Sequence, residues 1–386
     1  MRFTVERKVM VSALKNISVC VGRSTLPILY NVAIEAKDGK ITMTCSNLHI
    51  EFAVCVAPIE ILEEGTTSVN AKKLLSILES VSIDGIKMES DTDNYHLHIN
   101  AGKAEFLLLG LNPNGFPHIE AEGETERVEE IDTEMLYKIF STNKFACSRE
   151  PTRPALQGIN VIFERNQISA FASDGKVLSC IECNIDRDKD DDYNVIYPTD
   201  LYTMFSPNIY LGAKVKVINY KNCVVIKGDS ASITSKVVEG NYPNVKAVIP
   251  NTDDFKTFIV DSKVFDEKCK LSSVFSTESN KTLSIKFINH ATEFLTTTEQ
   301  NGTYKDSIEN DIEIPEGGEV ELRFTVNYLS NIIHGALNDS NKLNIMFKSG
   351  TVPIVFYDNS TAGTLKKIIL MPLRPKKPAE EQQQKG

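Results

Sequence analysis

Apolar and polar positions follow the same order at the start of three segments of the chain. Each segment opens with a short run suited to a strand, at 3–5, 128–131 and 258–260. Each run continues into an amphipathic stretch, at 6–21, 133–146 and 262–275. In the first stretch Met10, Leu14 and Ile17 recur at helical spacing. Asp132 and Asp261 stand where helix N-caps belong. The pattern therefore predicts a strand followed by a helix, three times.

Each opening is followed by two further strand-like runs. They lie at 29–36 and 41–45, at 158–164 and 168–172, and at 283–288 and 293–298. The first pair is joined at Asp38-Gly39 and the second at Arg165-Asn166. Short strands separated by small polar turns are typical of antiparallel hairpins.

A second helix is predicted in each segment, and its position gives the period of the repeat. These helices are expected to start at Val69, Tyr197 and Val326, which are almost evenly spaced along the chain. The first two segments also end alike, with an aromatic-proline step at Pro117 and Pro243. We therefore expect three domains, at 1–125, 126–253 and 254–375, followed by a disordered tail at 376–386 that lacks apolar residues to pack.

The repeated unit predicts an α+β fold, in which two helices pack on an antiparallel sheet in each domain. The chain has 386 residues, of which 41% are apolar, so three packed domains are within its capacity. No apolar run is long enough to cross a bilayer, and residues 1–7 do not resemble a signal peptide. A cytoplasmic protein is expected.

Charge and candidate chemistry narrow the function mainly by exclusion. The formal net charge of -10 argues against a surface that is basic everywhere, but it allows basic residues to line one surface. The pair Cys180 and Cys183 lies in an extended stretch without a second such pair, so a redox or zinc role is disfavoured. The chain has no phosphate-binding G-x-x-x-x-G-K-[ST] loop and no G-x-S-x-G nucleophile motif.

Two other clusters suggest metal binding only weakly. The acidic run Asp186, Asp188 and Asp190 lacks the glycine and the glutamate that a calcium loop needs at its sixth and twelfth positions. His96 and His98 share one strand face without an evident third ligand. A solvated acidic loop and a chance pair of exposed histidines are the favoured interpretations, and no metal or cofactor is expected.

Six short motifs, taken together, carry a resemblance to a known family. They are MRFTVER at 1–7, RSTLPIL at 23–29, TRPALQG at 152–158, SDGKVL at 173–178, KVVEGNYP at 236–243 and LMPLR at 370–374. In this order, within a chain of three repeats, they resemble the beta subunit of bacterial DNA polymerase III, the sliding clamp. The resemblance covers residues 1 to about 374.

The resemblance implies a non-enzymatic processivity factor. Two three-domain subunits would join head to tail into a closed ring of six domains around duplex DNA. Sequence-independent contacts with phosphates would allow the ring to slide. The implied partners are a second copy of the chain, double-stranded DNA, the polymerase III alpha subunit, the clamp loader and other proteins with a clamp-binding motif, but no membrane.

The resemblance also implies three groups of site residues. Candidate DNA-binding residues are Arg7, Lys15, Arg23, Lys72, Lys138, Lys144 and Arg149, with further lysines at Lys263, Lys268 and Lys270. A peptide-binding groove is implied at Arg153, Leu156, Ser173, Gly175, Leu178, Pro243, Val248, Tyr328, Met371, Pro372, Leu373 and Arg374. The dimer interface is implied at Lys73, Phe106, Leu108, Val274 and Phe275.

Some residues depart from the family pattern. Asp200 stands where a basic residue is common, and the stretch 326–337 has neither lysine nor arginine, so the DNA-facing charge is thinner here. Lys176, Val177 and Ala247 differ from commoner groove residues, so the selectivity of the groove stays open.

Two rival functions remain open on sequence grounds. One is a hydrolase whose carboxylates are brought together by folding, although a threefold repeat is unusual for an enzyme with one active site. The other is a repeat scaffold that binds proteins and not DNA. A ring-shaped dimer that stays on circular DNA would separate the clamp from both.

Overall fold

The computed structural model describes residues 1–21, 26–123, 127–186, 191–205, 210–310, 312–314, 318–337 and 340–374. Contacts divide the chain into two compact units. The first is formed by residues 1–137 and 200–237, and the second by residues 138–199 and those from 238 onward. Arg23, Asp188, Asp190 and the tail at 376–386 lie outside the described residues. No described helix is both long and apolar enough to span a membrane.

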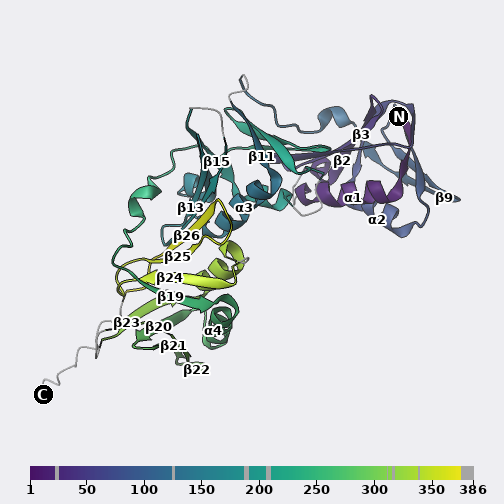
Figure 1. The fold of residues 1–386 in the computed structure, drawn as a ribbon. Coiled ribbons are helices and arrows are strands. Elements are labelled where there is room, and N and C mark those ends of the chain that lie inside the picture. Colours follow the sequence, from purple (N-terminus) through teal and green to yellow (C-terminus); the bar gives the residue numbers. More distant parts are fainter. Residues whose placement is uncertain are drawn as a thin grey trace, which may run out of the picture. The chain divides into compact units, whose positions relative to one another are not determined.

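The first unit contains two antiparallel sheets (Figure 1). The five-stranded sheet has the order β5 (Glu60–Glu63), β1 (Arg2–Glu6), β7 (Gly85–Ser90), β8 (Leu97–Ala101) and β9 (Ala104–Leu108). The nine-stranded sheet has the order β10 (Gly110–Leu111), β6 (Gly65–Asn70), β2 (Asn31–Lys37), β3 (Lys40–Ser46), β4 (Ile50–Val56), β18 (Ala231–Lys236), β17 (Cys223–Lys227), β16 (Lys214–Asn219) and β11 (Arg127–Asp132).

The second unit also contains two antiparallel sheets. The eight-stranded sheet has the order β15 (Tyr193–Pro198), β12 (Gly158–Glu164), β13 (Gln167–Ser173), β14 (Val177–Asn184), β26 (Thr364–Leu370), β25 (Ile354–Asp358), β24 (Lys342–Phe347) and β19 (Lys256–Asp261). The four-stranded sheet has the order β22 (Gly302–Glu309), β21 (Ala291–Thr298), β20 (Thr282–Ile288) and β23 (Val320–Thr325).

Helices pack against one face of the sheets. The α-helices are α1 (Arg7–Ile17), α2 (Ala71–Ser80), α3 (Thr133–Asn143), α4 (Ser262–Phe275) and α5 (Val326–Asn331). The 3-10 turns are η1 (Ser18–Cys20), η2 (Pro27–Tyr30), η3 (Pro113–Gly115), η4 (Lys144–Ala146), η5 (Pro154–Gln157), η6 (Thr199–Met204) and η7 (Val245–Val248). A π-helical turn, η8 (Ile332–Ala336), follows α5 directly. Figure 1 shows α1 and α2 side by side, and the two helices contact each other.

Alternation along the strands explains how the sheets bury one face. In β4 every second residue is buried, from Ile50 to Val56, and β7 repeats the pattern with Ile86 and Met88. Residues two apart in a strand share a face, so these side chains form the cores under the helices. In α1, Met10, Leu14 and Ile17 are fully buried on the face that the sequence pattern predicted.

Most predicted elements lie where the pattern placed them. The first hairpin turns at Asp38-Gly39, and both residues have positive φ (49° and 71°), as a tight two-residue turn requires. Helix α4 spans the predicted residues 262–275, and the Asp261 carboxylate accepts hydrogen bonds from Lys263 N and Val264 N at 2.9 and 3.2 Å. The predicted starts of the second helices at Val69 and Tyr197 were wrong, because these residues still pair in strands β6 and β15.

The second helix of the middle segment differs further from the prediction. Its described part, η6, is a six-residue 3-10 turn and not an α-helix. Pro198 has no backbone N–H, yet it pairs at the end of β15, so the chain is still extended one residue before the turn begins. Leu201 and Met204 are nevertheless buried. The short turn therefore still places apolar side chains in the core, as the predicted helix would have done.

Candidate functional site

A tight turn between β13 and β14 forms one part of the implied peptide groove. The Asp174 carboxylate accepts hydrogen bonds from Lys176 N and Val177 N at 2.8 and 3.0 Å. The Ser173 hydroxyl donates to the Val177 carbonyl at 2.8 Å and accepts from Gly175 N at 3.1 Å. Gly175 has φ +89°, which favours glycine. A Cβ atom at this position would lie 3.5 Å from the Arg153 guanidinium. The motif at 173–178 therefore encodes a rigid turn.

Tyr328 ties α5 to this turn. Its hydroxyl donates a 2.6 Å hydrogen bond to the Asp174 carboxylate. Burial raises the pKa of the Tyr328 phenol, and the hydrogen bond and negative charge of Asp174 raise it further. The phenol therefore remains a neutral donor near pH 7, and the contact fixes both side chains. Asp174 was not among the predicted site residues, although it lies inside a quoted motif.

The end of β26 leaves the sheet beside the same turn. Met371 N donates to the Lys176 carbonyl at 3.0 Å, and Leu373 N donates to the Arg323 carbonyl at 2.7 Å. The Arg323 guanidinium donates to the Arg374 carbonyl at 3.3 Å. These bonds fix the backbone at 371–374 while Met371 and Leu373 remain 46% and 39% exposed. Two apolar side chains are thus held at the surface.

A buried apolar cluster supports this surface. Leu178, Phe171 and Ile369 pack with Cys180, Val245 and Val355, and Tyr242, Ile249, Phe255, Met346 and Ile162 pack against them. Pro243 is exposed and Val248 is 61% exposed, whereas Val245 between them is buried. The segment around η7 therefore has apolar side chains both in the core and at the surface. Burying such surface on a partner is favourable at about 25 cal/mol per Å².

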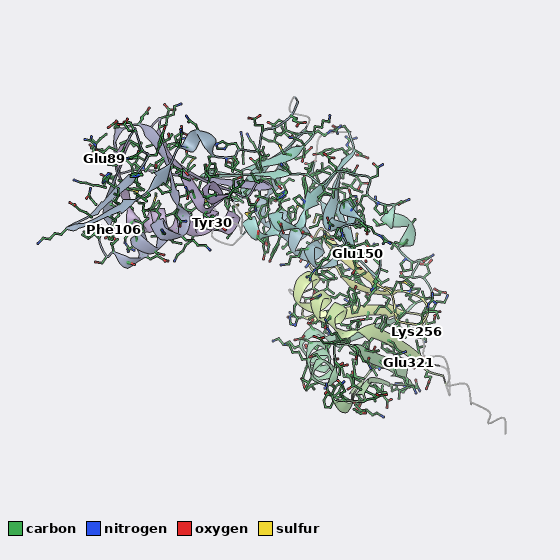
Figure 2. All side chains as sticks on the ribbon, turned by 180° about the vertical axis from the view of Figure 1, so that it is seen from behind. Tyr30, Glu89, Phe106, Glu150, Lys256 and Glu321 are labelled. Carbon is green, nitrogen blue, oxygen red and sulfur yellow. The ribbon has the colours of Figure 1, made fainter. Side chains whose placement is uncertain are left out.

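The predicted groove residues therefore divide into two kinds. Leu156 and Leu178 are buried at 8% and 4% exposure, so they support the surface from below. The others reach solvent to some extent, namely Arg153, Ser173, Gly175, Pro243, Val248, Tyr328, Met371, Pro372, Leu373 and Arg374. All of them belong to the second unit. Figure 2 labels Glu150, whose carboxylate lies 3.9 Å from Arg153 Nε.

The predicted DNA-binding residues have different surroundings. The Arg7 guanidinium donates to the Leu78 carbonyl at 3.3 Å, so it joins the start of α1 to the end of α2. Lys15 Nζ lies 2.8 Å from Glu79. Lys72 and Arg149 are exposed and form no ion pair with any described residue. Lys138 and Lys144 are half-buried and both have partners.

The lysines of α4 are largely neutralised within the chain. Lys268 Nζ lies 2.8 Å from the Asp306 carboxylate, and Lys270 Nζ lies 2.6 Å from Asp266. His334 Nε2 lies 2.8 Å from the same Asp266 carboxylate. Lys263 is exposed.

The predicted interface residues lie at two sheet edges and on nearby helices. Phe106 and Leu108 belong to β9, the edge strand that Figure 2 marks at Phe106. Val274 is 71% exposed at the end of α4, where Phe275 stacks on Tyr304 of edge strand β22 at 6.0 Å. Lys73 is exposed on α2. Leu107 in β9 and Leu109 just after it, which sequence reasoning did not name, are 53% and 72% exposed.

Residues considered for metal or redox chemistry have other partners. His98 Nε2 lies 3.4 Å from Asp91, and the His96 ring nitrogen accepts from Gly110 N at 3.2 Å. Burial raises the pKa of the thiols of Cys180 and Cys183, which keeps them protonated. No three histidine, cysteine or acidic residues that are described gather as metal ligands.

Comparisons with known proteins agree over nearly the whole chain. Two family profiles match: "DNA polymerase III beta subunit, N-terminal domain" at residues 1–120, and "DNA polymerase III beta subunit, central domain" at residues 130–244. Proteins named "Beta sliding clamp" from Staphylococcus epidermidis and Staphylococcus aureus are 23% identical, with 96% of each chain covered.

Solved structures match the fold to a similar extent. The DNA polymerase III subunit beta of Pseudomonas aeruginosa aligns with a TM-score of 0.87 at 21% identity, covering 97% of this chain and 100% of that one. The DNA polymerase sliding clamp of Bacillus subtilis aligns with a TM-score of 0.86 at 23% identity, covering 97% and 99%. The sliding-clamp fold is therefore shared, with broad antiparallel sheets and few helices.

Proposed function

The chain belongs to the DNA polymerase III beta subunit family, and from this premise we propose that it encircles duplex DNA as a sliding clamp. In this role it is a non-catalytic processivity factor that tethers the replicative polymerase to its template. The main observation behind the proposal is that strands from different repeats pair edge to edge and form shared sheets. The fold and the relatives named beta sliding clamp support the same role.

Three-stranded meanders recur in the sheets and meet edge to edge. The last strand of the meander β2-β3-β4 pairs with the last strand of β16-β17-β18. In the same way the last strand of β12-β13-β14 pairs with the last strand of β24-β25-β26. Two meanders lack such a neighbour among the described residues: β20-β21-β22 and β7-β8-β9.

The missing pairing points to a second copy of the chain. If β22 of one subunit pairs with β9 of another, the four-stranded and five-stranded sheets become one sheet as wide as the nine-stranded sheet. The contact is head to tail, and such contacts form rings when their rotation closes. Pairing would also remove both exposed strand edges, which are otherwise prone to aggregation. We infer three clamp domains, at 1–125, 126–253 and 254–375, and a homodimeric ring of six.

Side chains near the two edges suit this contact. Leu107 and Leu109 alternate with Phe106 and Leu108 on one edge, and Val274 and Phe275 lie close to the other. Apolar and aromatic residues are enriched at the centres of obligate interfaces. Lys73 would lie at the rim of the same interface.

In the ring, helices would face the DNA, and their basic side chains would contact phosphates. Lys72 and Arg149 are the best candidates, because each is exposed without an ion pair among the described residues. Arg7 and Lys15 have partners within the chain, so they contribute mainly to joining α1 and α2. Lys138 and Lys144 are retained as candidates, together with Arg23.

The surface around Met371, Pro243 and the 173–178 turn would bind short peptides from the polymerase III alpha subunit, the clamp loader and other clamp-binding proteins. Its rigid turn, exposed apolar residues and buried apolar support fit a groove that is formed before its ligand arrives. We place the protein in the cytoplasm, where bacterial replication occurs.

The interface can be tested with two matched variants. Val274→Asp introduces a charge at a residue near the β22 edge, and Ile59→Asp introduces the same charge at a similarly exposed residue beside β5. We expect light scattering to find a dimer for the wild type and Ile59→Asp, and a monomer for Val274→Asp. Dimers of both variants, or a wild-type monomer, would contradict the proposed ring.

The topological role needs DNA of two forms. Wild-type protein loaded by a clamp loader onto nicked circular DNA should remain bound through gel filtration, and cutting the circle should release it. Equal retention on circular and linear DNA would favour a conventional DNA-binding scaffold. A turnover activity that survives changes at Met371 and Tyr328 would favour an enzyme.

A further inference from the structure

A cavity of about 380 Å³ lies beside the proposed groove and was not indicated by sequence reasoning. It lies on the face of the eight-stranded sheet formed by β12, β13 and β15, under the segment that contains Tyr242 and Pro243. All lining residues belong to the second unit. The volume is within the range of sites for small ligands or single side chains.

The cavity adjoins the residues of the proposed groove at two positions. Pro243 lines the cavity and is also a predicted groove residue. Val245 lines the cavity and packs in the cluster that contains Leu178 and Ile369 beneath the groove. Because Pro243 belongs to both, residues that flank the motif of a peptide bound in the groove would lie close to this cavity.

The lining of the cavity combines apolar side chains with a buried amide. Ile162 and Phe171 form the apolar part. Asn160 is 5% exposed, and its side-chain oxygen accepts a 2.9 Å hydrogen bond from the Asn194 amide. The Asn160 amide nitrogen has no partner among the described residues. The Asn194 side-chain oxygen likewise stays available as an acceptor.

Two charged residues line the cavity, Lys246 and Asp192, and among the described residues only Lys246 has a counter-charge. Lys246 Nζ lies 3.4 Å from Glu164 and 5.9 Å from the centre of the Phe171 ring. Its charge is therefore balanced by Glu164, and the ammonium group also lies over the Phe171 ring. Asp192 is exposed and forms no ion pair with any described residue, so among these residues its negative charge is uncompensated.

We propose that this cavity binds an arginine or lysine side chain that flanks the clamp-binding motif of a partner peptide. The aliphatic part of such a side chain would pack on Ile162 and Phe171, while its cationic head would reach Asp192 and the Asn194 oxygen. Arginine fits better than lysine, because its planar guanidinium can also pack against Tyr193 and Tyr242, which line the cavity. The inference rests on the proposed peptide-binding function.

The first experiment selects peptides without assuming their sequence. A display library of random dodecapeptides is selected against the full-length dimer and against Asp192→Asn. A control, Asp253→Asn, removes the same charge from an exposed residue that does not line the cavity. We expect one shared apolar motif with all three proteins. A basic residue at a fixed flanking position should be enriched with wild type and Asp253→Asn only.

The second experiment measures the contact directly. A selected peptide and its copy with glutamine in place of the flanking basic residue are titrated by fluorescence anisotropy. The glutamine copy should bind wild type about threefold to tenfold more weakly, as expected for one exposed ion pair with a ring contact. The difference between the two peptides should be clearly smaller in Asp192→Asn than in the wild type.

The outcomes separate this inference from the function on which it rests. A shared apolar motif without a basic flanking residue, or a preference that is undiminished in Asp192→Asn, would overturn the cavity assignment and leave the groove intact. If the wild type selects no shared motif at all, the proposed peptide groove itself fails.

Discussion

Helices α2 and α4 both present lysines, but their lysines differ in how much charge they offer to a ligand. Lys72 on α2 is exposed and has no ion pair among the described residues. On α4, Lys268 and Lys270 lie 2.8 and 2.6 Å from Asp306 and Asp266. A lysine held by a carboxylate must give up that contact to bind a phosphate, so part of its binding energy is lost.

The difference shows that counting basic residues overstates the positive charge that these helices have free to contact phosphates. Sequence alone lists Lys72, Lys268 and Lys270 as equivalent candidates. The neighbouring carboxylates distinguish these lysines. Asp306 lies beside Lys268, and Asp266 lies beside both Lys270 and His334. We therefore expect the first domain to contribute more of the phosphate contacts than the third.

The largest predicted effect tests this expectation with two substitutions of equal charge. Lys72→Gln should weaken DNA binding about tenfold near 0.1 M salt and lower the slope of log affinity against log salt by about 0.9 per lost phosphate contact. Lys270→Gln should leave the slope almost unchanged. Affinities are measured at several salt concentrations by anisotropy on duplex DNA. Equal slopes for the two variants would contradict the comparison.

A smaller effect is expected at the N-termini of the same helices. Asp261 accepts two backbone hydrogen bonds at the start of α4, whereas the Asn70 side chain accepts one, from Lys73 N at 3.0 Å, at the start of α2. Replacing either by alanine should cost about 1 kcal/mol. Asp261→Ala should cost more, because its negative charge also favours the helix N-terminus.

Hydrogen exchange is the suitable measurement for these caps, because a chain of several domains does not unfold in one step. Faster exchange of the first-turn amides of α4 in Asp261→Ala, and of α2 in Asn70→Ala, is expected. Serine at each position provides a control that should restore most of the protection. Unchanged exchange in Asp261→Ala would show that the cap contributes little.

The sequence predicted most local elements because their signals are local. The helical spacing of Met10, Leu14 and Ile17, the Asp261 cap and the Asp38-Gly39 turn each depend on a few neighbouring residues. The short 3-10 form of η6 was missed, because it depends on how Leu201 and Met204 pack and not on their spacing alone.

The site was less accessible to sequence reasoning, because its geometry depends on distant residues. The hydrogen bond between Tyr328 and Asp174 joins positions 154 residues apart, and no pattern in either motif signals it. Pairing of β4 with β18 and of β14 with β26 likewise joins different repeats. The groove residues could be predicted only from the resemblance to a family and not from sequence patterns. That resemblance gave no indication of the cavity at Asn160.

The smallest predicted effect concerns the ion pair that neutralises Lys268. The hydrogen bond from Lys268 lowers the pKa of Asp306 below its ordinary value of 3.8, and Ser307 N and the Tyr304 hydroxyl act in the same direction. A lowered pKa means that the stabilisation is complete above about pH 5 and is lost as the pH falls through the folded-state value. Lys268→Met should therefore destabilise the protein at pH 7 by less than about 1 kcal/mol, since the pair is partly exposed. The difference from wild type should shrink towards pH 3, whereas Lys263→Met should show no such trend. Hydrogen exchange of α4 amides at both pH values measures this, and a difference that grows on acidification would show that Lys268 is not neutralised by Asp306.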